Sequence, residues 1–263
     1  MAIKITAAQV NELRKKTGAG MMDCKKALVE TEGDFEKAID ALRKKGQKVA
    51  AKREDREAGE GVALGKANAD NTKASFIILN CETDFVAKNE DFIGFANNIL
   101  KVAIENSITT VEELKAAKLP EGLTIDEKIT EQTGVIGEKI DLKSFEVLSG
   151  EYVAAYNHPG NRLAAGVVLN KKVDTAEEVA KEIAMQVAAM NPIALDKSGV
   201  SEEVVAREFE VGKEQAIQEG KPAEMAEKIA TGRLNKYFKE NTLLAQEYFS
   251  DNKKTVAQFL QSV

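Results

Sequence analysis

The sequence has little of several residue types on which chemistry in proteins usually depends. Its 263 residues include no tryptophan, one histidine and two cysteines. Because His158 is the only histidine, a histidine cluster that binds a metal is excluded. Cys24 and Cys81 lie in different segments and show neither metal-ligand nor redox spacing. We therefore expect two reduced thiols in a cytosolic protein and no metal site.

Long apolar stretches and nucleotide-binding motifs are also missing. No apolar run approaches the roughly 20 residues that span a bilayer, and the N-terminus lacks the apolar core of a signal peptide. The stretch Gly18-Ala19-Gly20 has neither a third glycine nor a preceding strand, so it is no dinucleotide fingerprint. A nucleophile pair of Cys24 and His158 is disfavoured, because Cys24 falls on the apolar face of a predicted helix. We expect a cytoplasmic binding protein without membrane contact or cofactor, and not an enzyme.

Charge is abundant and unevenly distributed along the chain. Residues 1–56 hold 14 Lys and Arg against 9 Asp and Glu, a net charge of +5. The remaining residues hold 23 basic against 34 acidic side chains, a net charge of −11. This asymmetry favours a separate N-terminal module and electrostatic guidance toward a partner.

The first 46 residues are predicted to form three short helices. Thr6 and Gln9 have the spacing of a capping box at the start of the first helix. The second helix is expected over 21–31, and Asp34 is expected to cap the third. Gly46 then has the position of a C-cap. We expect a three-helix domain over 1–46.

A charged segment over 47–61 is predicted to link this domain to the rest of the chain. Basic residues recur every four positions and would form one stripe on a helix, namely Lys44, Lys48, Lys52 and Arg56. Aromatic residues do not interleave with them, and acidic residues follow, so a solvated linker is favoured over a nucleic-acid site.

The remainder predicts an α+β core in which a hairpin followed by a helix occurs twice. The first copy has strands at 61–67 and 73–82 and a helix at 89–105. The second has strands at 152–157 and 163–169 and a helix that ends at 190, which Thr175 is expected to cap with Glu178 three residues on. Further helices are expected to begin at the caps Thr110 and Thr124, and a strand is expected at 140–148. We assign two related subdomains, 62–149 and 150–263.

An antiparallel helical pair is predicted within the second subdomain. The helices are expected at 201–218 and 222–240, with Gly220 ending the first and Pro222 starting the second. Their apolar positions are too sparse for a large core, so we expect a projecting arm over about 201–240. A capped helical segment is expected at 255–263.

One stretch points to a binding site. The apolar strand that ends near Cys81 runs into an acidic turn that carries Phe85, and a helix begins within a few residues. An aromatic held beside the carboxylate of Asp84 on a rigid scaffold is suited to insertion into a partner. The alternative is that Phe85 folds back under its own strand.

Two stretches resemble bacterial elongation factor Ts. Residues 13–28, LRKKTGAGMMDCKKAL, are similar to that family's N-terminal signature, and residues 82–89, ETDFVAKN, are similar to its second signature. Weaker similarities follow in the same order along nearly the whole chain, at Ile136-Gly137-Glu138, His158, Ile183-Ala184-Met185 and Gly220-Lys221-Pro222.

The resemblance implies a translation elongation factor that acts as a guanine nucleotide exchange factor for elongation factor Tu, a GTPase. It implies an N-terminal ubiquitin-associated-like three-helix domain, a two-part α+β core and a helical hairpin arm. It implies no direct contact with nucleic acid. The family usually continues past a segment like 255–260 into another strand and a terminal helix, whereas this sequence ends at Val263. We expect either a short member or a truncated one, in which the second subdomain lacks a strand.

The resemblance also implies the contact residues. The aromatic of the second signature wedges into the GTPase near its magnesium and phosphate site, which assigns Thr83, Asp84, Phe85 and Val86 to the wedge. The N-terminal domain contacts the same GTPase domain through Arg14, Met21 and Met22. Further contact positions are Ile136, Gly137 and His158.

Alternatives remain for several of these residues. Met21 and Met22 are both candidates for the core, but neighbouring helical positions point about 100° apart, so one should be exposed. His158 has the alternative role of stabilising its hairpin turn. For the whole protein, the alternatives are a nucleic-acid-binding protein that uses the basic three-helix head, and an adaptor by analogy with ubiquitin-associated domains.

Overall fold

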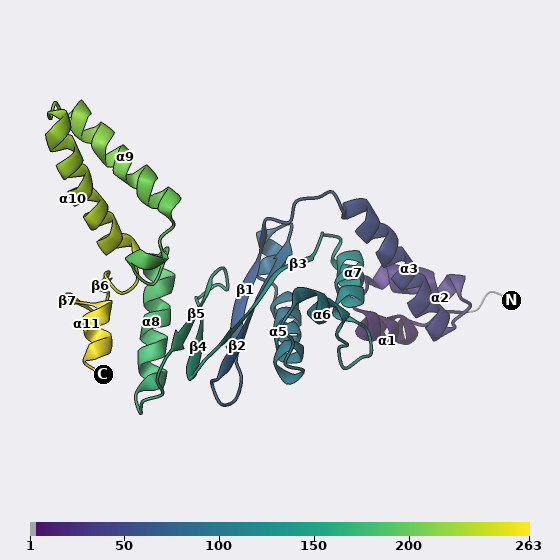
Figure 1. Cartoon of the computed structure of the whole chain (residues 1–263). Helices are drawn as coiled ribbons and strands as arrows, with labels where there is room; N and C mark the ends of the chain where they lie inside the picture. The colour runs from purple at the N-terminus through teal and green to yellow at the C-terminus, as the bar shows by residue number, and fades with distance from the viewer. Residues whose placement is uncertain (1–3) are drawn as a thin grey trace. The chain divides into compact units, whose positions relative to one another are not determined.

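The computed structural model describes residues 4–263, and its elements divide between two compact units. The first unit holds the chain up to Ala69, together with Ala74–Val147 and Asn157–Ala164. The second unit holds Asp70–Lys73, Leu148–Tyr156 and Ala165–Val263. Figure 1 shows helices and short strands in both, which confirms the predicted α+β class.

The first unit begins with three helices, α1 (Ala7–Thr17), α2 (Met21–Glu30) and α3 (Phe35–Arg53). The predicted capping box at the start of α1 is present. The Thr6 hydroxyl accepts a hydrogen bond from the backbone amide of Gln9, and the Gln9 side-chain oxygen accepts one from the backbone amide of Thr6. The Asp34 cap of α3 is also present. A small core joins the three helices, formed mainly by Val10, Leu13, Ala19, Cys24, Ala27, Leu28 and Ala38.

The prediction that α3 ends at Gly46 is wrong. The helix continues to Arg53, so residues 47–53, which were expected in the linker, are helical. Gly46 is buried against Gly134 of α7 (Ile125–Ile136), and a Cβ atom at Gly134 would overlap the Cα of Gly46. The two glycines allow the backbones of α3 and α7 to approach closely. This packing offsets the cost of about 1 kcal/mol for a glycine inside a helix.

A three-stranded sheet forms the centre of the first unit, with the order β1 (Glu60–Ala67), β2 (Lys73–Cys81) and β3 (Asp141–Ser149). The antiparallel pair β1–β2 has Val62 opposite Leu79. Helices α5 (Glu90–Glu105), α6 (Val111–Ala116) and α7 contribute the rest of this core. The predicted strands are confirmed to within one residue at each end, and the caps Thr110 and Thr124 are present.

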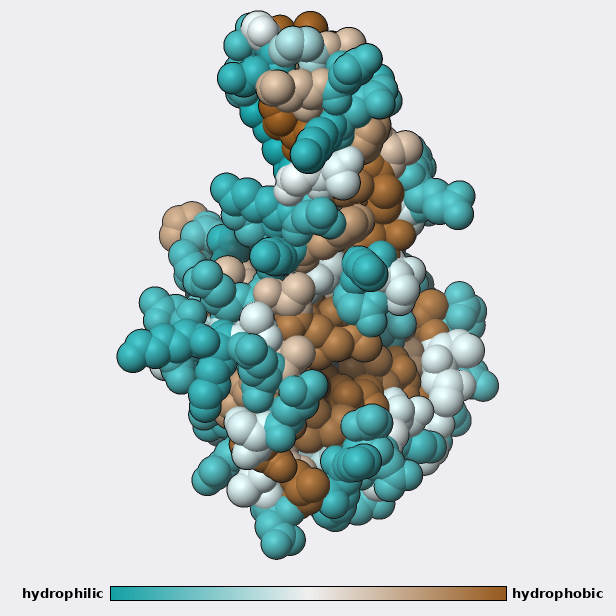
Figure 2. All heavy atoms as spheres, turned by 60° about the vertical axis from the view of Figure 1, so that its left-hand side comes forward, coloured by the Kyte–Doolittle hydropathy of each residue, from teal (hydrophilic) through white to brown (hydrophobic). Residues whose placement is uncertain are grey.

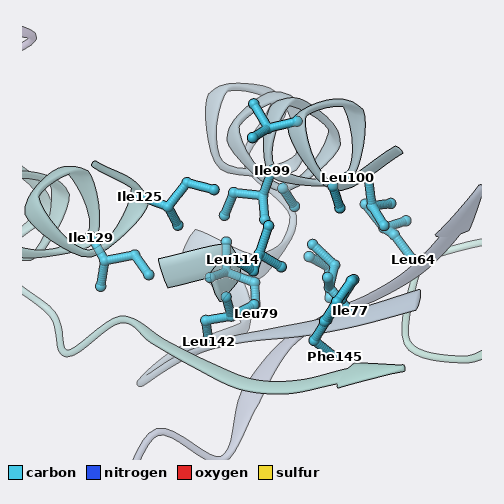
Figure 3. Packing of buried hydrophobic residues seen from close by; sticks show 14 of the residues in the cluster. Leu64, Ile77, Leu79, Ile99, Leu100, Leu114, Ile125, Ile129, Leu142 and Phe145 are labelled. Carbon is cyan, nitrogen blue, oxygen red and sulfur yellow. The ribbon is translucent and has the colours of Figure 1, made fainter. Parts of the chain in front are cut away.

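The core around the three-stranded sheet is one apolar cluster (Figure 3), separate from the small core of the first three helices. It combines strand residues with residues of α5, α6 and α7, including Leu64, Ile77, Leu79, Leu142, Phe145, Ile99, Leu100, Leu114, Ile125 and Ile129. Complete burial of one such side chain contributes about 1.5–3 kcal/mol. This cluster therefore gives a rigid support for the segments that leave the sheet.

The hairpin β4 (Tyr152–Asn157) and β5 (Ala164–Leu169) has most of its strand residues in the second unit, whereas its turn, Asn157–Ala164, belongs to the first. Helix α8 (Ala176–Met190) follows in the second unit. Both hairpin-plus-helix predictions are thus confirmed as elements. Thr175 occupies the N-cap position of α8, but its side chain makes no capping hydrogen bond, so the predicted cap is wrong in that detail. A short pair, β6 (Glu247–Tyr248) and β7 (Asp251–Thr255), was not predicted.

The predicted helical pair is present as α9 (Glu202–Gln218) and α10 (Ala223–Asn241). The buried residues between the two helices are small, namely Gly212, Ala216, Ala226 and Ala230. The unit also contains the 3₁₀ turn Lys197–Gly199 and ends with α11 (Val256–Gln261). Several large apolar side chains of this unit are exposed, among them Ile193 and Leu195. Figure 2 shows hydrophobic residues gathered on the face that it draws.

Candidate functional site

The connection from β2 to α5 forms one short helical turn, α4 (Asp84–Ala87). The Thr83 hydroxyl accepts the Val86 amide at 3.5 Å, and Asn89 caps α5 by accepting the amide of Asp91 at 2.8 Å. Two caps six residues apart therefore define the turn. We call residues 83–86 the Thr83 turn.

Phe85 points away from the protein. Its side chain is 83% exposed, whereas Val86 packs against the main core of the unit and Ala87 is buried. The alternative that Phe85 folds under its own strand is therefore wrong. A single helical turn has only one inward face, and Val86 and Ala87 occupy it.

The polar neighbour of Phe85 carries a stable negative charge. The Asp84 carboxylate accepts a hydrogen bond from Lys88 Nζ at 2.6 Å. This bond is the main reason that the pKa of Asp84 lies below its usual value, and the positive charges of Lys88 and Arg162 act in the same direction. Both partners of the ion pair are largely in solvent, so it contributes little to stability.

Two carboxylates lie behind the Thr83 turn. Glu138, two residues past the end of α7, accepts the amides of Glu82 at 3.1 Å and Thr83 at 2.9 Å, and the Thr83 hydroxyl at 2.7 Å. Glu82 accepts the Lys139 amide at 2.7 Å. Glu82 also accepts two bonds from Arg53 Nη1, at 2.7 and 2.9 Å. The Lys139 amide and then Arg53 lower the pKa of Glu82.

The thiols do not form a reactive centre. Cys81 is buried below the turn and donates to the Thr83 carbonyl at 3.2 Å. Burial raises the pKa of this thiol to about 11, so it stays protonated at neutral pH. Cys24 is buried in the small core of the first three helices. Within residues 4–263, no group of three or more His, Cys, Asp and Glu side chains has a metal-binding arrangement.

An open groove runs beside Phe85. It encloses about 690 Å³ and is lined from five segments: Gly18 between α1 and α2, the Thr83 turn, the first half of α5, the connection between α6 and α7, and one face of α7. Three of the predicted contact residues, Phe85, Val86 and Ile136, line this same groove. Gly137 then ends α7 in the left-handed conformation, at φ 81°, and turns the chain toward Glu138.

The predicted residues of the N-terminal helices are on the surface. Arg14 on α1 is exposed, and Met21 and Met22 at the start of α2 are exposed by 58% and 73%. We expected one of the two methionines to be exposed and find both. They follow the turn at Gly18, which lines the groove beside Phe85.

His158 lies at an exposed turn that is held against β1. The Asn161 carbonyl accepts the Ala63 amide at 2.7 Å, and the Asn157 side chain exchanges two hydrogen bonds with the backbone of Gly65. The backbone of His158 closes the turn by bonding to Asn161 and Leu163. The turn that carries His158 therefore belongs to the first unit, as the Thr83 turn does.

Sequence reasoning did not assign Glu138, Arg53 or Glu82 to the site. Glu82 and Glu138 fall within the quoted similarities, but nothing in the sequence places their carboxylates together. Arg53 lies in a stretch that was predicted to be a solvated linker. Glu82 precedes Thr83 in the chain, whereas Arg53 reaches Glu82 from the end of α3 and Glu138 reaches the Thr83 turn from the segment after α7.

Comparison with known proteins gives a consistent result. A family model described as "Elongation factor TS" matches residues 82–263. Elongation factor Ts of Christiangramia forsetii is 55% identical over 260 residues, which are 99% of this chain and 94% of the relative. The protein of that name from Flavobacterium psychrophilum is 51% identical over 259 residues, covering 98% and 93% of the two chains. The one from Prosthecochloris aestuarii is 48% identical over 265 residues, covering 98% and 92%.

Both signatures noted in the sequence lie within these full-length similarities, and the second begins where the family match begins. Among residues 4–263, no helix combines the length and apolar character needed to cross a bilayer. The chain belongs to the elongation factor Ts family, and it is a translation elongation factor of protein biosynthesis.

Proposed function

We propose that the protein is a guanine nucleotide exchange factor that binds elongation factor Tu in its GDP form and promotes release of GDP. The observation that carries this proposal is Phe85, an aromatic side chain that is 83% exposed on a turn held by hydrogen bonds from behind. Exposure of a large aromatic on a rigid turn is typical of an anchor that a partner covers. Membership of the elongation factor Ts family supports the identity of that partner.

In this proposal, residues 83–86 insert near the magnesium and phosphate site of the GTPase. GTPases hold GDP largely through phosphate contacts and bound Mg²⁺, so a wedge that disturbs this region weakens the nucleotide. Phe85 is the inserted group and Asp84 its polar neighbour, while Thr83 and Val86 hold the turn. The exchange factor forms and breaks no covalent bond, so it is not an enzyme in the chemical sense.

A second contact surface is proposed for the N-terminal helices. Arg14, Met21 and Met22 are exposed, and Gly18, which lies between Arg14 and Met21 in the chain, lines the groove beside Phe85. Methionine is suited to adaptable contact surfaces. Ile136, Gly137 and His158 are proposed as further contact positions. The division into domains at 1–46, 62–149 and 150–263 and a cytoplasmic location remain part of this proposal.

Thermodynamic linkage makes the effects of GDP and of this protein on the GTPase reciprocal. If binding of this protein lowers the affinity of the GTPase for GDP by some factor, GDP lowers the affinity for this protein by the same factor. The ternary complex must therefore dissociate readily in either direction. A wedge that acts in this complex changes the rate of GDP release more than it changes the affinity between the two proteins.

Surface ion pairs of the basic head disfavour a nucleic-acid-binding role. Several lysines of the head pair with acidic side chains on the surface, including Lys16 with Glu12 and Lys37 with Asp34. These ion pairs reduce the positive potential that phosphate binding requires.

Stopped-flow release of fluorescent GDP from elongation factor Tu tests the proposal. The wild type should accelerate release strongly. Phe85→Ala should lower the maximal rate by about tenfold or more, which corresponds to a barrier higher by about 1.4 kcal/mol, because the side chain that opens the nucleotide site is removed. Phe249→Ala is the matched control, because Phe249 is also an exposed phenylalanine, at 47%, but lies in the second unit. No acceleration by the wild type would overturn the function. Equal losses of rate and affinity in Phe85→Ala would overturn the wedge.

A further inference from the structure

The Thr83 turn is held by a carboxylate from a distant part of the sequence. Glu138 is 55 residues from Thr83, yet it accepts both the amide and the hydroxyl of Thr83, at 2.9 and 2.7 Å. The same carboxylate accepts the Glu82 amide at 3.1 Å. Three donors at the start of one turn therefore converge on one side chain. Hydrogen bonds of this kind to an ionised acceptor are stronger than those between neutral groups.

This arrangement differs from an ordinary cap within the same unit. Glu113 also accepts the amide and the hydroxyl of one threonine, Thr109, but it does so from four residues away and at 3.3 and 3.4 Å. The Glu113 bonds belong to the local start of α6. The Glu138 bonds instead connect the end of α7 to the end of β2, where Phe85 follows.

A second carboxylate extends the connection. Glu82 joins the Lys139 amide on one side and the Arg53 guanidinium, near the end of α3, on the other. Lys139 Nζ in turn donates to the Glu54 carbonyl at 2.6 Å. The segments at the ends of α3, β2 and α7 are thus tied together next to the Thr83 turn, and the Phe85 side chain of that turn is exposed.

We propose that Glu138 is a positioning residue for exchange: it fixes the Thr83 turn so that Phe85 is presented in one orientation before the partner binds. This inference rests on the proposed function of Phe85. Glu138 itself need not touch the GTPase or the nucleotide. Glu138 acts by keeping the turn ordered. A turn that is already fixed loses less conformational entropy when Phe85 is inserted.

The proposal predicts a lower rate of GDP release with little change in the affinity for the partner. The three hydrogen bonds of the Glu138 carboxylate go to Glu82 and Thr83, so we expect the N-terminal helices to continue to hold the partner when the carboxylate is removed. Insertion of Phe85 requires the turn in its ordered form, so the step that opens the nucleotide site is slowed. Misplacement of a positioned group by about 1 Å can cost as much as a hundredfold in rate.

Three variants test this. Glu138→Ala removes all three acceptor interactions. Glu138→Gln keeps one oxygen that can accept the Glu82 and Thr83 amides, and its amide group can donate to the Thr83 hydroxyl. Glu113→Ala is the matched control, since it removes the corresponding bonds to Thr109 far from Phe85 along the chain.

Two measurements are made on the full-length protein. The first is the GDP release rate as a function of exchange-factor concentration, which separates the maximal rate from the apparent affinity. Glu138→Ala should lower the maximal rate by about tenfold with a change in affinity below about threefold, and Glu138→Gln should restore most of the rate. The second is hydrogen exchange of residues 82–88 in the free protein, which should become faster in Glu138→Ala and stay unchanged in Glu113→Ala.

The outcomes distinguish the two levels of the proposal. If the wild type fails to accelerate release, the proposed function is overturned, while hydrogen exchange still reports whether Glu138 orders the turn. If the wild type is active and Glu138→Ala matches it in maximal rate, the positioning role is overturned. The role is also overturned if Glu113→Ala loses as much activity, or if Glu138→Ala loses rate with no change in exchange over 82–88.

Discussion

The two hairpin-plus-helix regions differ most in the segment that joins hairpin to helix. After β2, the chain forms the Thr83 turn, with caps at Thr83 and Asn89 and two carboxylates behind it. After β5, residues 170–175 are exposed, and Thr175 stands at the helix start without a capping bond from its side chain. The same order of elements therefore supports an ordered, hydrogen-bonded turn in one region and a plain surface connection in the other.

The difference arises from elements outside the hairpin and helix. In the first region, Glu138 follows α7 and Arg53 ends α3. Among the described residues, no such carboxylate or arginine from a distant part of the chain bonds to residues 170–175 of the second region. Both regions contain a hairpin followed by a helix, so these elements alone do not explain the difference between the two connections. What makes the first connection a candidate site is the added contact of α3 with α7, which brings charged side chains to the turn.

The largest expected effect comes from separating α3 from α7. In Gly134→Ala the new Cβ meets the backbone of Gly46, which cannot move aside like a flexible side chain. We expect the free energy of unfolding to fall by about 1–3 kcal/mol, as for other overpacked sites. Denaturant unfolding measures this change.

Gly232→Ala in α10 is the control for that substitution. Nothing lies within 4 Å of a Cβ at Gly232, so alanine should raise the free energy of unfolding by about 0.5–1 kcal/mol through helix propensity alone. If Gly134→Ala is equally stabilising, the close approach of α3 and α7 is not a feature of the folded protein, and the origin assigned to the first connection is wrong.

A smaller effect is expected from pH through Glu82. The Lys139 amide and Arg53 lower the pKa of this carboxyl below 4.5 in the folded protein. A lowered folded pKa gives stability that is complete above the unfolded pKa and is lost as pH falls through the folded pKa. The wild type should therefore lose more stability than Glu82→Gln between about pH 5 and pH 3. Unfolding at a series of pH values measures this, and parallel curves for the two proteins would exclude the Glu82 contribution.

Much of the fold could be predicted from the sequence because its signals are local. The Thr6 and Thr124 capping boxes each join residues three positions apart, and both are present. Apolar runs bounded by turn residues placed the long strands. The two-residue strand β6 was missed, because a segment this short has no period to read.

The candidate site could be predicted only in part. Phe85 stood out because an aromatic in a polar turn has no local partner. Glu138 and Arg53 could not be assigned, because their partners lie 55 and 29 residues away. Gly46 was misread for the same reason. A glycine near a predicted helix end is typical of a C-cap, and only the packing with Gly134 shows why it lies inside the helix.

The smallest expected effect is at the second connection. Val173 is 40% exposed in the segment before α8, whereas Val86 of the Thr83 turn packs against the core of the first unit. Val173→Ala should change the free energy of unfolding by less than about 0.5 kcal/mol, as for surface substitutions. Val86→Ala, the same chemical change, should cost about 1 kcal/mol or more through lost packing.

Both variants also enter the GDP release assay. Val173→Ala should match the wild type, and Val86→Ala should release GDP more slowly because the turn that carries Phe85 loses its inward contact. A loss of exchange activity in Val173→Ala would mean that the second connection also reaches the GTPase. The two connections would then share a role, and the added contacts from α3 and α7 would not be what distinguishes them.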